Sequence, residues 1–184
     1  MARTPPSDTA LHVAELSQTA ENLFSIAPAG AELTALAQQL GLSALRKLRF
    51  EGRIKPLGAT DWQLKARLGA TVVQPCVVTL EPVTTRIDID VARAFVQGYQ
   101  EPDEPETEMT DDDTTEALGS WIDPALVMQE ALALAVPDYP RKDNATLGQL
   151  VYTKPGDAPM TDEDARPFAG LADLKSKLEK GGDD

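Results

Sequence analysis

The sequence predicts an α+β fold: an antiparallel β-sheet packed against two main helices, with an acidic loop insertion and an irregular C-terminal tail. Three stretches of alternating apolar and polar residues predict strands, and two stretches with apolar residues at helical spacing predict helices. The length of 184 residues favours one domain, which we place at 1–150 with the acidic loop at 99–118. Residues 151–184 are expected to form an extended or disordered tail with a short helix at 168–179.

The N-terminal part is expected to contain two short strands, at 11–16 and 23–26, followed by a helix at 31–40. Gly41 is placed to end this helix, because glycine readily adopts the left-handed conformation that closes a helix. The apolar residues of the helix recur at i, i+3, i+4 and i+7, which places them on one face: Leu33, Leu36, Ala37 and Leu40.

Residues 47–55, 62–68 and 83–91 are the predicted central strands. Successive side chains of a strand point to opposite faces, so the apolar residues of each stretch face a core and the polar residues between them face solvent. Turn residues separate the first two stretches, which predicts a hairpin. The third stretch carries Arg86, Asp88 and Asp90 on its polar side.

A second long helix is predicted from residue 124 to about 135. Asp123 can accept hydrogen bonds from the free amides of the first turn, and Pro124 lacks the amide that would go unpaired there. Pro137 ends the helix. Apolar residues cover most of its circumference, which predicts packing against the sheet: Leu126, Val127, Met128, Ala131, Leu132 and Leu134.

Acidic residues outnumber basic residues by 30 to 17, a net charge of −13 that opposes simple coating of DNA, RNA or anionic lipid. The excess is local, because residues 101–116 hold nine acidic residues and no Lys or Arg, including Asp111, Asp112 and Asp113. The rest of the chain carries 21 acidic and 17 basic residues, a net of −4. We expect the acidic stretch to be a solvated loop rather than a calcium site.

The sequence offers no catalytic residue and no cofactor motif, and we expect a protein that is not an enzyme. The one histidine, His12, lies in a weakly structured region, and no phosphate-cradling glycine loop is present. The one cysteine, Cys76, cannot form an internal disulfide, which favours a reducing compartment, the cytoplasm. The longest apolar run, 131–136, is too short to span a membrane. An enzyme built on carboxylates remains an open alternative.

The predicted hairpin carries a local excess of positive charge. Between residues 45 and 68 there are seven basic and two acidic residues, a net of +5. Alternation places most of this charge on one face, which suits RNA phosphates without base stacking. The equally weighted alternative is an ordinary solvated face. The candidate RNA-binding residues are Lys47, Arg49, Arg53, Lys55, Lys65 and Arg67.

Three blocks of the sequence resemble the bacterial YceD-like proteins, called large ribosomal RNA subunit accumulation proteins. The first block runs from Gln74 to Val83 and resembles the C-x-x-C-x-x-P-[FV] element that precedes a strand in that family, with Thr79 in place of the second cysteine. The second joins Asp123 to the helix that ends at Pro137, and the third lies near the end of the chain. The residues that match are Cys76, Pro82, Val83, Asp123, Glu130, Pro137, Pro167 and Phe168.

One thiolate cannot complete a four-ligand zinc site, so we expect no metal and expect Cys76 to be buried, with a reactive thiol as the alternative. The resemblance implies a non-enzymatic cytoplasmic role in large-subunit (23S) ribosomal RNA accumulation or ribosome assembly. The implied partner is ribosomal RNA or a pre-ribosomal particle. The acidic stretch could instead attract basic ribosomal proteins, and we expect no membrane or DNA partner. The alternative is a protein–protein adaptor that uses the acidic loop or the apolar stripe at 168–178. The acidic stretch could also fold back over the basic face.

Overall fold

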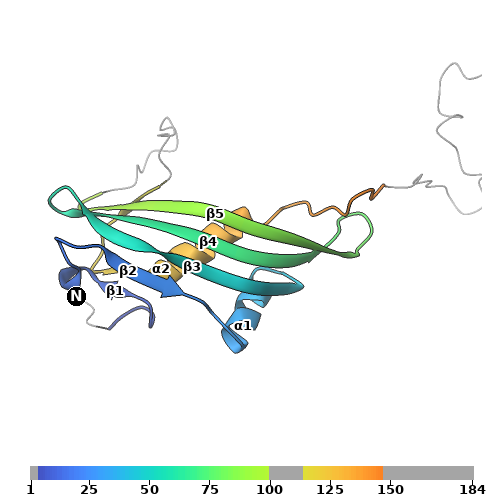
Figure 1. The fold of residues 1–184 in the computed structure, drawn as a ribbon, viewed down its shortest axis with the longest axis horizontal. Helices are drawn as coiled ribbons and strands as arrows, with labels where there is room; N and C mark the ends of the chain where they lie inside the picture. The colour runs from blue at the N-terminus through green and yellow to red at the C-terminus, as the bar shows by residue number, and fades with distance from the viewer. Residues whose placement is uncertain (1–3, 100–113, 147–184) are drawn as a thin grey trace, which may run out of the picture. The chain divides into compact units, whose positions relative to one another are not determined.

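The computed structural model describes residues 4–99 and 114–146 (Figure 1). The chain divides into the units Met1–Asp143 and Asn144–Asp184, and the fold is that of the first unit. Its elements are β1 (Leu11–His12), a 3₁₀ turn (Val13–Glu15), β2 (Asn22–Ile26), α1 (Ala31–Gln39), β3 (Ala44–Leu57), β4 (Asp61–Pro75), β5 (Pro82–Val96), β6 (Thr115–Ala117), β7 (Trp121–Ile122) and α2 (Pro124–Ala135). The predicted α+β class is confirmed. The tail at 151–184, with its helix at 168–179, lies outside the described residues.

A five-stranded sheet, ordered β2-β3-β4-β5-β6, forms the main layer, and β1 pairs with β7 in a separate two-stranded sheet. The first four strands of the main sheet pair antiparallel, as predicted, but β6 pairs parallel with the end of β5. The sheet is therefore mixed rather than purely antiparallel. Parallel neighbours need a long connection, and residues 97–114 provide it. The last residues of the expected acidic loop thus form a strand, whereas residues 100–113 lie outside the described part.

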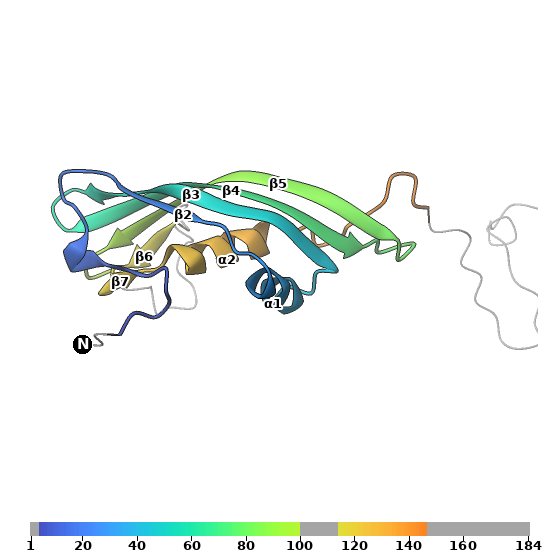
Figure 2. The ribbon, with the colours of Figure 1, turned by 60° about the horizontal axis from the view of Figure 1, so that its bottom comes forward.

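Both helices lie on the same face of the sheet, which defines an inner face and an outer face (Figure 2). The largest buried side chains of the sheet point toward the helices, and Met128 and Leu132 of α2 meet them. Burying each such side chain stabilises the fold by about 1.5–3 kcal/mol. The fully buried members from β3 and β4 are Phe50, Ile54, Trp62, Leu64 and Leu68.

The ends of the helices follow the sequence signals. Gly41 has a φ of +65°, and the Leu42 amide donates to the Ala37 carbonyl, which closes α1 with the expected glycine turn. Asp123 accepts a hydrogen bond from the Ala125 amide at the start of α2. The predicted packing of α2 against the sheet is confirmed for Val127, Met128, Ala131 and Leu132, but it is wrong for two residues, because Leu126 is 64% exposed and Leu134 80% exposed. The helix is covered by the sheet on one side only.

A β-bulge interrupts the alternation of β3. The register with β4 shifts between Arg46 and Arg49, and Leu45 and Leu48 are both buried although they are three residues apart. Lys47 lies in the bulge and has a φ of +52°, an uncommon conformation for a residue with a side chain. The bulge therefore presents Arg46, Lys47 and Arg49 in close succession on the exposed side of the strand.

Candidate functional site

The outer face of the sheet carries the six basic residues predicted from the sequence. Their inward neighbours on β3 and β4 are buried in the core, and nothing among the described residues covers the outer face (Figure 2). Strand pairing sets Arg53 opposite Lys65 and Lys55 opposite Gln63, so positive charge runs across two strands. The structure thus brings together the predicted set: Lys47, Arg49, Arg53, Lys55, Lys65 and Arg67.

Acidic residues share this outer face and form ion pairs that the sequence did not predict. Arg49 lies 3.5 Å from Glu51, and Arg67 lies 3.6 Å from Asp90 of β5. Glu21, just before β2, lies 3.4 Å from Arg53 and 3.2 Å from Lys55. These pairs are exposed, and exposed pairs contribute about 0–1 kcal/mol each, so the paired cations can still exchange partners. The outer face is therefore positive but mixed.

Arg86 of β5 is a further cation of this face that was assigned only to the polar side of its own strand. Its Nε and Nη2 donate to the two carboxylate oxygens of Asp88 at 2.7 and 2.6 Å, and its Nη1 donates to the Thr71 hydroxyl at 3.4 Å. The hydrogen bonds from Arg86 lower the pKa of Asp88. The pairing of β4 with β5 would have predicted that Arg86 lies near the basic residues of β3. Thr71 of β4 stands opposite both Arg46 and Arg86.

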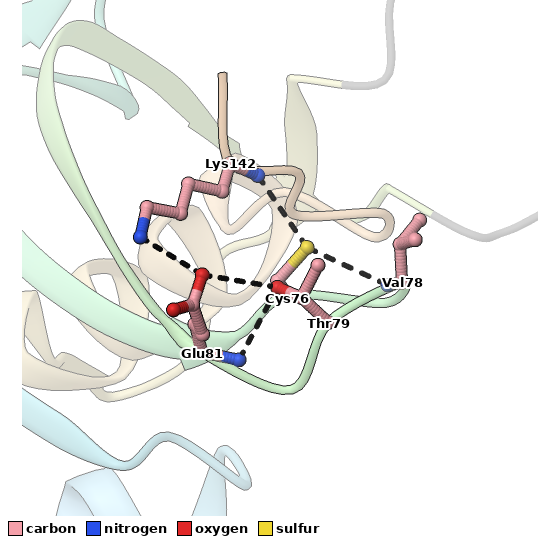
Figure 3. Close-up of polar contacts among 5 residues, drawn as sticks. All are labelled: Cys76, Val78, Thr79, Glu81 and Lys142. Carbon is pink, nitrogen blue, oxygen red and sulfur yellow. Dashed lines mark hydrogen bonds and ion pairs between the residues drawn. The ribbon is translucent and has the colours of Figure 1, made fainter. Parts of the chain in front are cut away.

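Cys76 lies in the turn between β4 and β5, and its side chain is fully buried, as expected. The amides of Val78 and Lys142 each donate to its sulfur at 3.5 Å (Figure 3). Hydrogen bonding from the Thr79 side chain and the Lys142 amide outweighs burial and lowers the pKa of Cys76 to about 6. A hydroxyl thus occupies the position of the second cysteine and stabilises the thiolate.

The segment after α2 is held against this turn. The Val77 amide donates to the Pro140 carbonyl at 2.9 Å, and Lys142 Nζ lies 2.8 Å from a carboxylate oxygen of Glu81 (Figure 3). The hydrogen bond from Lys142 lowers the pKa of Glu81. These contacts join residues some sixty positions apart, so no local pattern in the sequence predicts them. Their role is to fix the turn.

The remaining family-motif residues within the described part hold the fold. Pro82 and Val83 begin β5, and Pro137 accepts a hydrogen bond from the Gln74 side chain at 3.1 Å. Asp123 caps α2 and accepts a hydrogen bond from the Thr9 hydroxyl at 2.9 Å. Glu130 pairs with Arg93 at 2.9 Å. The others lie outside the described residues: Pro167 and Phe168, with Asp111, Asp112 and Asp113 of the acidic loop.

Among the described residues, His12 belongs to no catalytic or metal-binding cluster. The ring centroids of His12 and Trp121 lie 4.7 Å apart, and His12 Nδ1 lies 3.7 Å from a carboxylate oxygen of Glu15. Within residues 4–99 and 114–146, no three His, Cys, Asp or Glu side chains converge as metal ligands. The helices of these ranges are all too short to be membrane spans.

A family model described as large ribosomal RNA subunit accumulation protein YceD matches residues 64–175, more than half of the chain. The match begins in β4, so it includes Lys65, Arg67 and Arg86 of the outer face and excludes β3 with its bulge. No curated protein and no solved structure matches the chain. The resemblance predicted from the sequence is confirmed, and the chain belongs to the YceD family of large ribosomal RNA subunit accumulation proteins.

Proposed function

We propose that this protein binds large-subunit ribosomal RNA through the outer face of its sheet and acts as a non-enzymatic cytoplasmic factor in ribosome assembly. The family is named for the accumulation of that RNA. The single observation that carries the proposal is the exposed basic face, which spans β3, β4 and β5 on the side opposite both helices. Its arginine and lysine side chains can contact phosphates.

The proposed binding is driven by charge and shape rather than by base reading. The outer-face positions of β3 and β4 carry no aromatic side chain on which a base could stack. The acidic balance of the whole chain does not oppose local binding, because the basic residues are gathered on one face. The affinity should therefore fall steeply with salt, as it does when bound phosphates release counterions.

The test replaces Arg49, Arg53 and Lys65 together by glutamine and measures RNA affinity as a function of salt. The control adds the same net charge of −3 to the helix layer with Gln38→Glu, Gln39→Glu and Ala133→Glu, at exposed positions. The outer-face variant should bind more weakly, with a salt slope reduced by about 2–3, whereas the control should match the unmodified protein. Equal affinity of all three proteins would remove the proposal.

A second candidate function, a protein–protein adaptor, is favoured by the outward side of α2. Leu126 and Leu134 are exposed there, two turns apart on one side of the helix. Capture of partners from lysate before and after ribonuclease treatment separates the two functions. Partners that disappear with the RNA support RNA binding, and partners that persist and depend on Leu126 and Leu134 support the adaptor.

A further inference from the structure

The bulge in β3 forms one wall of a hollow on the outer face. The hollow has a volume of about 520 Å³ and is lined by Ala27, Lys47, Leu48, Arg49, Thr71 and Arg86. Its polar atoms come from three neighbouring strands: two cations from β3, one from β5, and the Thr71 hydroxyl from β4 between them. Three cations and a hydroxyl around one concave space form a set of hydrogen-bond donors suited to an oxyanion.

Two unusual backbone features lie at or beside the hollow. Lys47 has a positive φ, which a glycine would adopt without strain, yet the chain places a lysine there. Gly69 is the outward residue of β4 between Arg49 and Asp88, and a β-carbon at Gly69 would lie 2.8 Å from Arg86 Nη2. A glycine inside a strand weakens the strand and often marks a close approach of a ligand or side chain. Strained backbone likewise gathers at ligand sites.

The charge of the hollow matches a monoanion. Arg86 is held by Asp88, and Arg49 lies near Glu51, so each of these cations has one acidic neighbour. Lys47 has no ion pair with any residue in the described part of the chain. The three cations that line the hollow and their two acidic neighbours leave an excess of at least one positive charge, because exposed Arg46 also lies beside Lys47. A phosphodiester carries one negative charge and presents free oxygens that can accept from all of these donors.

We propose that this hollow binds one phosphodiester group of the RNA backbone, with Lys47, Arg49 and Arg86 as its cations and Thr71 as a neutral donor. The inference rests on the proposed function and adds to it a fixed anchor point. The rest of the outer face, centred on Arg53 and Lys65, then supplies diffuse attraction. The two regions are six residues apart along β4, or about 20 Å.

The test compares Lys47→Asn with the matched control Lys65→Asn. Asparagine tolerates the left-handed conformation of position 47, so the first variant should stay folded. Each variant removes one lysine from the same face. The probes are dimethyl phosphate, followed by amide chemical shifts in NMR, and a single-stranded RNA, followed by its dissociation constant.

Dimethyl phosphate should shift the amides around residues 47–49, 71 and 86 in the unmodified protein and in Lys65→Asn, but not in Lys47→Asn. RNA affinity should fall about tenfold in Lys47→Asn, equal to about 1.4 kcal/mol, and less than threefold in Lys65→Asn. Equal losses in the two variants, or shifts spread over the whole face, would overturn the anchor while leaving RNA binding intact. Loss of the proposed function would show instead as unchanged RNA affinity in the triple glutamine variant.

Phospholipids also contain phosphodiesters, so vesicles of phosphatidylglycerol and phosphatidylcholine form the last arm. The protein should stay in solution when these vesicles are sedimented. Co-sedimentation that is lost in Lys47→Asn, together with weak RNA binding, would assign the hollow to a lipid headgroup and contradict the inference.

Discussion

Arg93 of β5 lies 2.9 Å from Glu130 of α2, and its Nε lies 3.3 Å from Glu116 of β6. The Arg93 side chain is only 11% exposed, so a nearly buried cation joins the sheet, its parallel edge strand and the covering helix. Glu130 is one of the family-motif residues, and this ion pair gives a structural role to the acidic side chain at that position. A buried charge that loses its partner destabilises a fold, so the stability of this protein depends on keeping both members of the pair.

We predict that Arg93 and Glu130 are energetically coupled. Glu130→Gln should lower the free energy of unfolding by about 1–2 kcal/mol, less than for a fully buried pair because Glu130 is partly exposed and Arg93 keeps Glu116. A double-mutant cycle with Arg93→Met, measured by chemical denaturation, gives the coupling energy. The same cycle on the exposed pair Arg49 and Glu51 should give about 0.5 kcal/mol or less. Similar coupling in both cycles would contradict the burial argument.

The thiol of Cys76 should ionise near neutral pH. Its pKa is lowered from the ordinary 9.0 to about 6, with the Thr79 hydrogen bond as the largest cause. Ultraviolet absorbance of the thiolate, followed against pH, measures this value. Thr79→Val should raise the pKa, whereas Thr84→Val, on the exposed side of β5, should leave it unchanged. A midpoint near 9 in the unmodified protein would show that burial prevails over the hydrogen bonds.

The same shift predicts a pH dependence of stability. The folded protein holds the Cys76 thiolate better than the unfolded chain does, so this contribution is complete above about pH 9 and is lost as the pH falls through about 6. The free energy of unfolding should therefore rise between pH 6 and 9 by more in the unmodified protein than in Thr79→Val. Parallel curves for the two proteins would contradict the assignment.

Among the glycines that the structure describes, Gly52 should be the least tolerant of a side chain. It faces Ala66 across the β3–β4 pair, and a β-carbon there would overlap the Lys65 carbonyl oxygen and the Ala66 side chain. Gly52→Ala should lower the free energy of unfolding by about 1–3 kcal/mol, the usual cost of overpacking. Gly119→Ala is the control, because its nearest atoms lie at 3.8 Å. Thermal melts that rank the two variants in the opposite order would disprove the close packing.

The left-handed conformation of Lys47 should lower the stability of the fold, whereas its side chain serves the proposed phosphate binding. Relief of a left-handed conformation is worth about 1–2 kcal/mol, which offsets the flexibility that a glycine adds to the unfolded chain. Lys47→Gly should therefore be as stable as the unmodified protein or more so, whereas Lys65→Gly, inside β4, should lose about 0.5–1 kcal/mol. Denaturation midpoints check both. A Lys47→Gly protein that is less stable than Lys65→Gly would show that position 47 is not strained.

The sequence was sufficient to predict the elements whose signals are local. Alternation marked β3, β4 and β5, and the pair Asp123 and Pro124 marked the start of α2. The bulge was missed although its signal is local too: Leu45 and Leu48 cannot both face the core in a regular strand. The expectation of regular alternation concealed it. The outward face of β3 was still predicted correctly, because regular pairing with β4 resumes after the bulge. This face carries Lys47, Arg49, Arg53 and Lys55.

Long-range relationships were beyond the sequence. Nothing near Thr115 predicts that it pairs parallel with Ala94, and nothing near Cys76 predicts Lys142. Asp88 and Asp90 were recognised as outward residues of one strand, but their ion pairs with the basic face depend on sheet order. Leu126 and Leu134 misled for a related reason: composition alone does not tell which side of an apolar helix is covered.

The most direct test of RNA binding by the outer face is ultraviolet cross-linking of the intact protein in living cells, followed by sequencing of the bound RNA and mass spectrometry of the cross-linked peptides. Large-subunit ribosomal RNA should be found joined to peptides of β3, β4 and β5. RNA joined only to peptides of α1 and α2, or proteins recovered with no RNA attached, would contradict it.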